Sequence, residues 1–156
     1  MTNSPYLPPQ ATLTTPTNSN AVPTLLYSPT QAACGTIGGP VGLVYFLWKN
    51  FRSLNNESAA KKTVLYGGFF IIALTALIPF LPENIPNTIF TIAYIITARH
   101  VAEKHQMSKQ AIKDSPLHDF QSNWRVLGVG LLCLIASAII IIGPLLLLAM
   151  IGVWNP

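Results

Sequence analysis

Four long apolar runs, separated by short polar segments, follow one another along the chain from residue 32 onward. They cover about 32–48, 63–81, 85–102 and 126–151. A helix rises about 1.5 Å per residue, so a run of about 20 residues crosses the roughly 30 Å of hydrocarbon in a bilayer. The second and fourth runs reach that length, and the other two lie near its lower limit. The pattern therefore predicts an all-α integral membrane protein with four transmembrane helices.

The first run contains glycine and proline near its middle, at Gly38, Gly39 and Pro40. Proline lacks the amide donor of a helix interior, and it is tolerated in lipid where neighbouring helices satisfy the freed backbone groups. The run is therefore either a kinked crossing helix or a re-entrant element. A run that re-entered from outside would leave Lys49 on the wrong side of the membrane, so we predict a Gly/Pro-kinked helix.

The third run is short, with fourteen uncharged residues from 85 to 98 before Arg99. A long arginine side chain can extend from a helix to the membrane surface. Helix-forming residues continue to Lys113, where a turn sequence with proline begins. We expect one long helix whose first half lies in the membrane and whose second half protrudes from it, with a half-spanning hairpin as the alternative.

Residues 1–30 have a different composition from the rest of the chain. They contain six prolines, fourteen Ser, Thr, Asn or Gln residues and no charged residue. Few large apolar side chains are present to offset the entropy of ordering, which is typical of disordered segments. We predict a disordered tail at 1–30, followed by a membrane domain at 31–156.

Composition supports a membrane protein. Hydrophobic residues make up 51% of the chain and charged residues only 9%, whereas soluble domains carry about 25% charged residues. The net charge of +4 would suggest nucleic-acid binding in a soluble protein, but in a membrane protein Lys and Arg set orientation. The bilayer is therefore the expected partner, and nucleic acid is not.

The nine Lys and Arg residues fall in two segments, four of them within 49–62 and five within 99–125. In a four-span arrangement both segments lie on the same side of the membrane. Basic loops of membrane proteins remain on the cytoplasmic side. The distribution therefore predicts cytoplasmic basic loops, with the N-terminus and the C-terminus both outside.

Glycines form one face of the first run, at Gly35, Gly38, Gly39 and Gly42. Small residues allow helix backbones to approach each other closely in lipid. We interpret this glycine face as a helix-packing surface, used mostly within the chain. Alternatively, a protein partner or a second copy of the chain could pack against this glycine face.

A polar stripe follows the third run, made of Asn87, Thr88, Thr91, Tyr94 and Thr97. Such a stripe is expected to avoid lipid. It could line a pore or a substrate path, or it could form hydrogen bonds with neighbouring helices, which is the commoner use of threonine in membranes.

The chain lacks the usual marks of catalysis and coupled transport. No Asp, Glu, Lys or Arg lies at the centre of a predicted span, where proton relays and ion-coupled transporters carry them. His100 and His105 are five residues apart, and a zinc helix needs histidines four apart. An enzyme would need one of these or His118 to meet Glu103 or Asp119. We therefore predict no metal, no cofactor and no enzymatic activity.

The chain contains three short islands, S-P-T-Q at 28–31, G-G-P at 38–40 and S-N-W-R-V at 122–126, with Asn50, Gln106 and His118 between them. In these islands the chain resembles a group of small bacterial multi-span proteins of unassigned function. The resemblance implies a bacterial inner-membrane protein and supplies no activity. The expected role is a non-enzymatic interaction or accessory subunit, and the alternative is a small passive pore or transporter component.

Overall fold

The structure of the protein is a computed structural model, which describes residues 23–80 and 86–152. Helices make up most of this part of the chain, so the all-α prediction is confirmed apart from one short two-stranded sheet. The elements in order are β1 (Thr24–Leu26), α1 (Pro29–Gly35), the 3-10 helix η1 (Thr36–Gly38), α2 (Gly39–Ser53), α3 (Glu57–Leu77), the 3-10 helix η2 (Ile78–Phe80), α4 (Asn87–His105), α5 (Lys109–Asp114), β2 (His118–Phe120) and α6 (Asn123–Met150).

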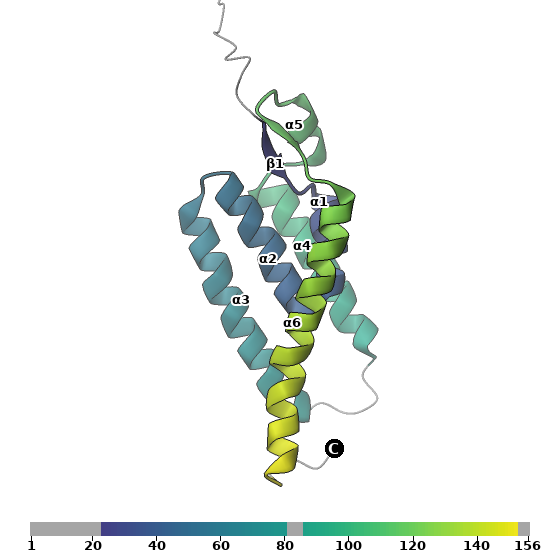
Figure 1. The fold of residues 1–156 in the computed structure, drawn as a ribbon. Helices are drawn as coiled ribbons and strands as arrows, with labels where there is room; N and C mark the ends of the chain where they lie inside the picture. Colours follow the sequence, from purple (N-terminus) through teal and green to yellow (C-terminus); the bar gives the residue numbers. More distant parts are fainter. Residues whose placement is uncertain (1–22, 81–85, 153–156) are drawn as a thin grey trace, which may run out of the picture.

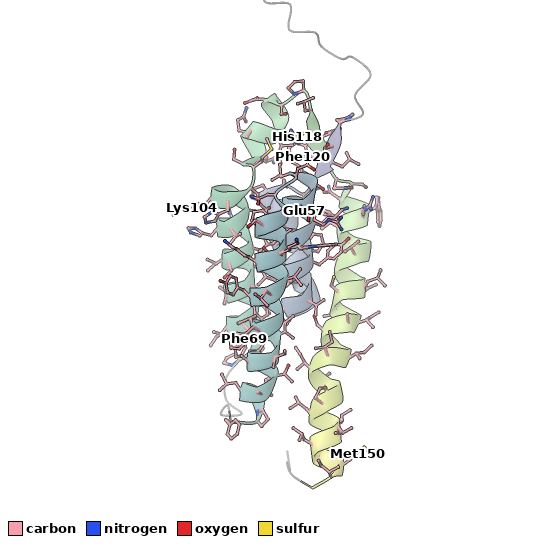
Figure 2. The ribbon with its side chains drawn as sticks, turned by 90° about the vertical axis from the view of Figure 1, so that its left-hand side faces the viewer. Glu57, Phe69, Lys104, His118, Phe120 and Met150 are labelled. Atoms are coloured by element: carbon pink, nitrogen blue, oxygen red, sulfur yellow. The ribbon has the colours of Figure 1, made fainter. Side chains whose placement is uncertain are left out.

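Three long helices, α3, α4 and α6, form a bundle, and α1, α5 and the two strands lie toward one end of it, while η2 lies toward the other end (Figure 1). At that end β1, α5 and β2 form a small cap, in which β1 and β2 pair in parallel with Thr24 opposite His118 and Leu26 opposite Phe120. The other end of the bundle holds the last turns of α6, where Met150 lies (Figure 2). We call these the cap end and the far end.

The first apolar run forms a helical hairpin, so the prediction of one kinked crossing helix is wrong. α1 runs away from the cap end, η1 reverses the chain, and α2 returns to the cap end (Figure 1). Contacts between the two arms show the reversal. Asn50 near the end of α2 is hydrogen-bonded to the backbone of Tyr27 just before α1, and Gly42 packs against the carbonyl oxygen of Gly35.

The glycine and proline residues explain why the run turns back. Gly39 has a φ of +75°, which glycine adopts without the steric cost that other residues incur. Pro40 stands in the first turn of α2, where helix amides have no partner within the helix and the missing N–H costs nothing. The Gly-Pro pair therefore begins a new helix and does not kink an existing one.

The two ends of the hairpin, before α1 and after α2, both lie at the cap end, beside the segment 99–125. The side chain of Asn50 is hydrogen-bonded to Gln106 at the end of α4, and β1 pairs with β2. Among the described residues, the N-terminal segment from Thr24 therefore lies at the same end of the bundle as residues 99–125. The predicted disordered tail also ends earlier than residue 30, since Leu26 and Tyr27 are buried; residues 1–22 lie outside the described part.

Two helices of the described chain are long and apolar enough to cross a membrane, Glu57–Phe80 and Asn123–Met150. Four were expected, but the first run is divided by η1 and α4 ends in the polar residues Arg99, Glu103 and Lys104. In the most apolar 18-residue stretch of Glu57–Phe80, no residue is buried inside the protein. In the corresponding stretch of Asn123–Met150, 17% of the residues are buried. A core helix of a soluble protein buries most of its apolar residues, so this exposure favours membrane association.

α4 ends at His105, earlier than predicted, and α5 is a separate short helix. The side chain of Ser108 accepts a hydrogen bond from the amide of Ala111 and so caps the start of α5. A serine cap satisfies free amides at a helix start and competes with continuation of the preceding helix. The prediction of one continuous helix to Lys113 is therefore wrong.

The buried core lies in the cap half of the molecule, between the hairpin, α4 and α6. Ala32 of α1 and the pair Ala98 and Ala102 of α4 have no exposed surface. Small side chains at these positions let the hairpin lie close to α4. The ring of Phe46 meets that of Tyr27 edge to face, with centroids 4.8 Å apart, and completes this core.

Candidate functional site

Asn50 is the centre of a buried network of amide side chains. It lies near the end of α2, and only 3% of its surface is exposed. Its Oδ1 accepts a hydrogen bond from the amide of Tyr27 at 2.9 Å, and its Nδ2 donates to the carbonyl of Tyr27 at 2.7 Å and to Oε1 of Gln106 at 2.8 Å. One side chain thus pairs with both backbone groups of Tyr27, which fixes the two arms of the hairpin against each other.

Gln106 extends this network to α4. Its Oε1 accepts from Asn50, and its Nε2 donates to the carbonyl of Leu47 at 3.0 Å. Gln106 follows the last residue of α4, so its amide joins the end of α4 to the returning arm of the hairpin. Gln106 is half-buried. An amide removed from water costs free energy unless its oxygen and nitrogen are both bonded, and here both are.

Gln31 joins the hairpin to α6. Its amide N–H donates to Ser28 Oγ, and its Oε1 accepts from the amide of Ser28, which is a capping box at the start of α1. Its Nε2 donates to the carbonyl of Gln121 at 2.6 Å and to Oδ1 of Asn123 at 2.8 Å. The side chains of Gln31, Asn50 and Gln106, here called the amide network, thus hold four segments together at the cap end.

Tyr27 adds a buried hydroxyl beside this network. Its ring is buried, and its Oη has no hydrogen-bond partner in the described structure. Burial raises the pKa of Tyr27, and Tyr45 adds to this effect, while the cation of Arg125 acts in the opposite direction. The hydroxyl therefore stays protonated at neutral pH, and the amide network contains no titratable group.

Ser137 of α6 stabilises the apex of the hairpin. Its hydroxyl donates to the carbonyl of Gly38 at 2.7 Å and accepts from the amide of Val41 at 3.3 Å. The amide of Gly39 is bonded within η1, and Pro40 has none. The first amides of α2 are therefore all satisfied, which an irregular backbone in apolar surroundings requires. Ser137 lies fourteen residues after Asn123, about halfway along α6.

We expect Ser137→Ala to lower the free energy of unfolding by about 2 kcal/mol, because it leaves a buried amide and a buried carbonyl at the apex without a partner. Chemical unfolding in detergent micelles measures the change. Thr75→Val is the matched control, since Thr75 bonds only to the carbonyl of Ile71 in its own helix, and a change below about 0.5 kcal/mol is expected. Equal losses in the two variants would contradict the role given to Ser137.

The glycine face lies inside the chain. Side-chain atoms added at Gly35 would meet the ring of Phe46, and at Gly42 the carbonyl of Gly35. Gly38 and Gly39 face α6, at Gly130 and Ser137 respectively. These contacts are all intramolecular, so they leave no room for a second copy or another partner at this face.

The polar stripe does not gather into one lining. Tyr94 is buried and its ring meets Phe70 edge to face at 6.1 Å. Thr88, Thr91 and Thr97 are exposed on the outside of α4. The side chain of Asn87 lies outside the described part, so the structure places four of the five stripe residues.

The histidines do not converge with acidic groups. His100 and His105 are exposed, and Nδ1 of His118 is 2.8 Å from Oγ of Ser115 in the same loop. Glu103 forms an ion pair with Arg99 on its own helix. In the described ranges no group of three His, Cys, Asp or Glu residues could hold a metal ion.

No family model, curated protein or solved structure matches this chain. Function must therefore be inferred from the geometry itself. Two apolar grooves are open on the surface, one of about 480 Å³ between α1, η1 and α6, and one of about 650 Å³ between α3, η2 and α6. Neither is lined by a charged side chain, so neither offers a polar path through one copy of the chain.

Sequence reasoning gave no structural role to Asn50, Gln106 or Ser137. Asn50 and Gln106 were visible only as uncharged polar residues at the ends of apolar runs, and Ser137 as a single hydroxyl within one. The signal that could have found them is that an amide or hydroxyl beside a long apolar segment needs a partner when it is buried. Which backbone groups they would meet depends on the reversal at η1.

Proposed function

We propose that this chain is an integral protein of a bacterial inner membrane, with three crossing helices and a hairpin that enters halfway, and that it acts as a non-enzymatic interaction or accessory subunit. The observation that carries the proposal is that the polar groups in and around the hairpin are hydrogen-bonded within this chain. Asn50, Gln106 and Ser137 are bonded to this chain's own atoms. A hairpin satisfied in this way can lie in hydrocarbon, and its bonded amides and hydroxyl serve the fold.

The proposed topology places the cap end in the cytoplasm. The basic segments 49–62 and 99–125 both lie at this end, as the bond between Asn50 and Gln106 supports, and basic loops favour the cytoplasmic side. α3, α4 and α6 then cross the bilayer. α4 has 19 residues and is about 28 Å long, and its polar end from Arg99 onward lies at the cytoplasmic surface, where Arg and Lys side chains extend to water. The N-terminal segment is cytoplasmic, and α6 ends on the opposite side.

Labelling of single cysteines tests this topology. Cysteines placed at positions 1, 56 and 110 are expected to be protected from a membrane-impermeant reagent added to intact cells, and a cysteine at 156 is expected to react. The background carries Cys34→Ser and Cys133→Ala. Reaction at position 1 with protection at 110 would overturn the hairpin topology and restore four crossings.

Exposed Thr88 and Thr91, three residues apart on α4, favour a second candidate, a passive pore formed by several copies around this side of α4. Purification in mild detergent separates the two functions. A stoichiometric protein partner, together with no flux of small solutes into liposomes that hold the purified chain, supports the accessory role. Solute flux from the purified chain alone supports the pore.

A further inference from the structure

Four basic residues flank the turn where α2 ends and α3 begins. They are Lys49, Arg52, Lys61 and Lys62, here called the turn cluster. Gly67 of α3 packs against Val44 of α2. Lys49 stands five residues after Val44 and Lys62 five residues before Gly67, so the two lysines lie at the same height along the antiparallel helices. The two antiparallel helices therefore bring these residues to the cap end, where α2 ends and α3 begins (Figure 1).

The turn cluster has little negative charge around it. Segment 49–62 holds four Lys or Arg and one acid, Glu57, a net of +3, whereas segment 99–119 holds four Lys or Arg and three acids, a net of +1. Glu57 lies at the start of α3 (Figure 2). The one ion pair found in the described part of the chain joins Arg99 to Glu103, so Glu57, four residues before Lys61 on α3, forms no ion pair with the turn cluster.

An apolar face continues directly from the turn cluster along α3. Leu65, Tyr66 and Phe69 stand three, four and seven residues after Lys62, on the same side of the helix. Their exposed fractions are 70%, 68% and 71%, and Phe69 projects from the bundle (Figure 2). A cationic site with an exposed apolar strip below it matches a molecule with an anionic head and hydrocarbon chains.

Arg52 is held in a position suited to phosphate. Its guanidinium lies over the ring of Trp48, 5.4 Å from the centroid, and Arg52 itself remains exposed. A planar guanidinium offers paired donors that fit phosphate oxygens, and tryptophan prefers the level of lipid headgroups. We propose that the turn cluster binds the phosphate of an anionic phospholipid, whose acyl chains lie along Leu65, Tyr66 and Phe69 of α3.

Lipid binding can be measured on the full chain released from nanodiscs of mixed phosphatidylcholine and phosphatidylglycerol, by native mass spectrometry. The wild-type chain is expected to retain phosphatidylglycerol in preference to phosphatidylcholine, and added salt is expected to weaken this preference. Each cation near an anionic surface contributes about fivefold, so the variant R52Q/K61Q/K62Q is expected to lose roughly a hundredfold. The control K104Q/K109Q/K113Q removes the same charge from α4 and α5 and is expected to lose little.

Equal losses in the two triple variants, or no preference for phosphatidylglycerol in the wild-type chain, would overturn the inference. Displacement of the lipid by inorganic phosphate would identify a free-phosphate site and overturn it as well. The inference rests on the membrane embedding proposed above, which cysteine labelling tests separately. If the cysteines label as expected but the chain shows no lipid preference, only this inference is overturned. If the cysteines do not label as expected, the proposed topology is overturned.

Discussion

Replacing Asn50 with alanine is expected to lower the free energy of unfolding by about 3 kcal/mol or more. The variant leaves the amide and the carbonyl of Tyr27 and the Oε1 of Gln106 without their partner, and each unsatisfied buried group costs about 1–3 kcal/mol. The hairpin arms lose their connection at the cap end, and α4 loses part of its contact with the hairpin. Thermal unfolding in detergent, followed by circular dichroism, measures the loss.

Asn56→Ala is the matched control for this experiment. Asn56 is exposed and its Oδ1 accepts one hydrogen bond, from the amide of Ala59 at the start of α3. Loss of such a cap costs about 1 kcal/mol. A loss for Asn50→Ala no larger than that of the control would mean that the amide network does not hold the hairpin.

The hairpin shows how far the sequence could predict this fold. Gly38, Gly39 and Pro40 were identified as an interruption of the first run, but a kinked helix and a turn require the same residues. The choice between them is made by contacts about ninety or more residues away, where Gly130 admits Gly38 closely and Ser137 bonds to both sides of the turn. Such contacts leave no periodic pattern in the sequence.

The distribution of Lys and Arg predicts that the two basic segments lie together. Lys and Arg were assigned to one side of the membrane, and the structure places both basic segments near one end of the bundle. The expected side of the N-terminal segment depends on counting the first run as a crossing, and a crossing reverses the side of everything before it. In the structure, β1 pairs with β2 and so lies at the same end as the basic segments, and a strand of three residues has no signal of its own in the sequence.

The candidate site was harder to predict than the fold. The glycine face and the polar stripe are visible as patterns because their residues repeat along one helix. The amide network takes three single residues from three segments far apart in the sequence, α1, α2 and the end of α4, so it has no spacing that could reveal it. Gln31 is the partial exception, since S-P-T-Q at 28–31 matches a capping box, although its bonds to Gln121 and Asn123 could not be foreseen.

Gly38→Leu is expected to lower the free energy of unfolding by about 3 kcal/mol. An atom added at Cβ of Gly38 would stand 2.5 Å from the carbonyl oxygen of Gly130 and 2.9 Å from Cβ of Cys133. The first of these is backbone, which cannot rotate away, and overpacking of a tight contact typically costs about 1–3 kcal/mol or more. Gly38 has a φ of −67°, which leucine also adopts, so the effect is steric. Chemical unfolding in detergent measures it.

Gly128→Leu separates this packing from a general effect of leucine in place of glycine. Gly128 lies on the same helix as Gly130, is exposed, and has nothing within 4 Å of an added Cβ. An alanine-like side chain stabilises a helix by about 0.5–1 kcal/mol relative to glycine, so this variant is expected to be unchanged or slightly more stable. If Gly38→Leu unfolded like the wild type but lost crosslinked species, the glycine face would pack between copies of the chain. A loss of stability with unchanged crosslinking places the contact inside one chain, where the hairpin needs it in order to lie against α6.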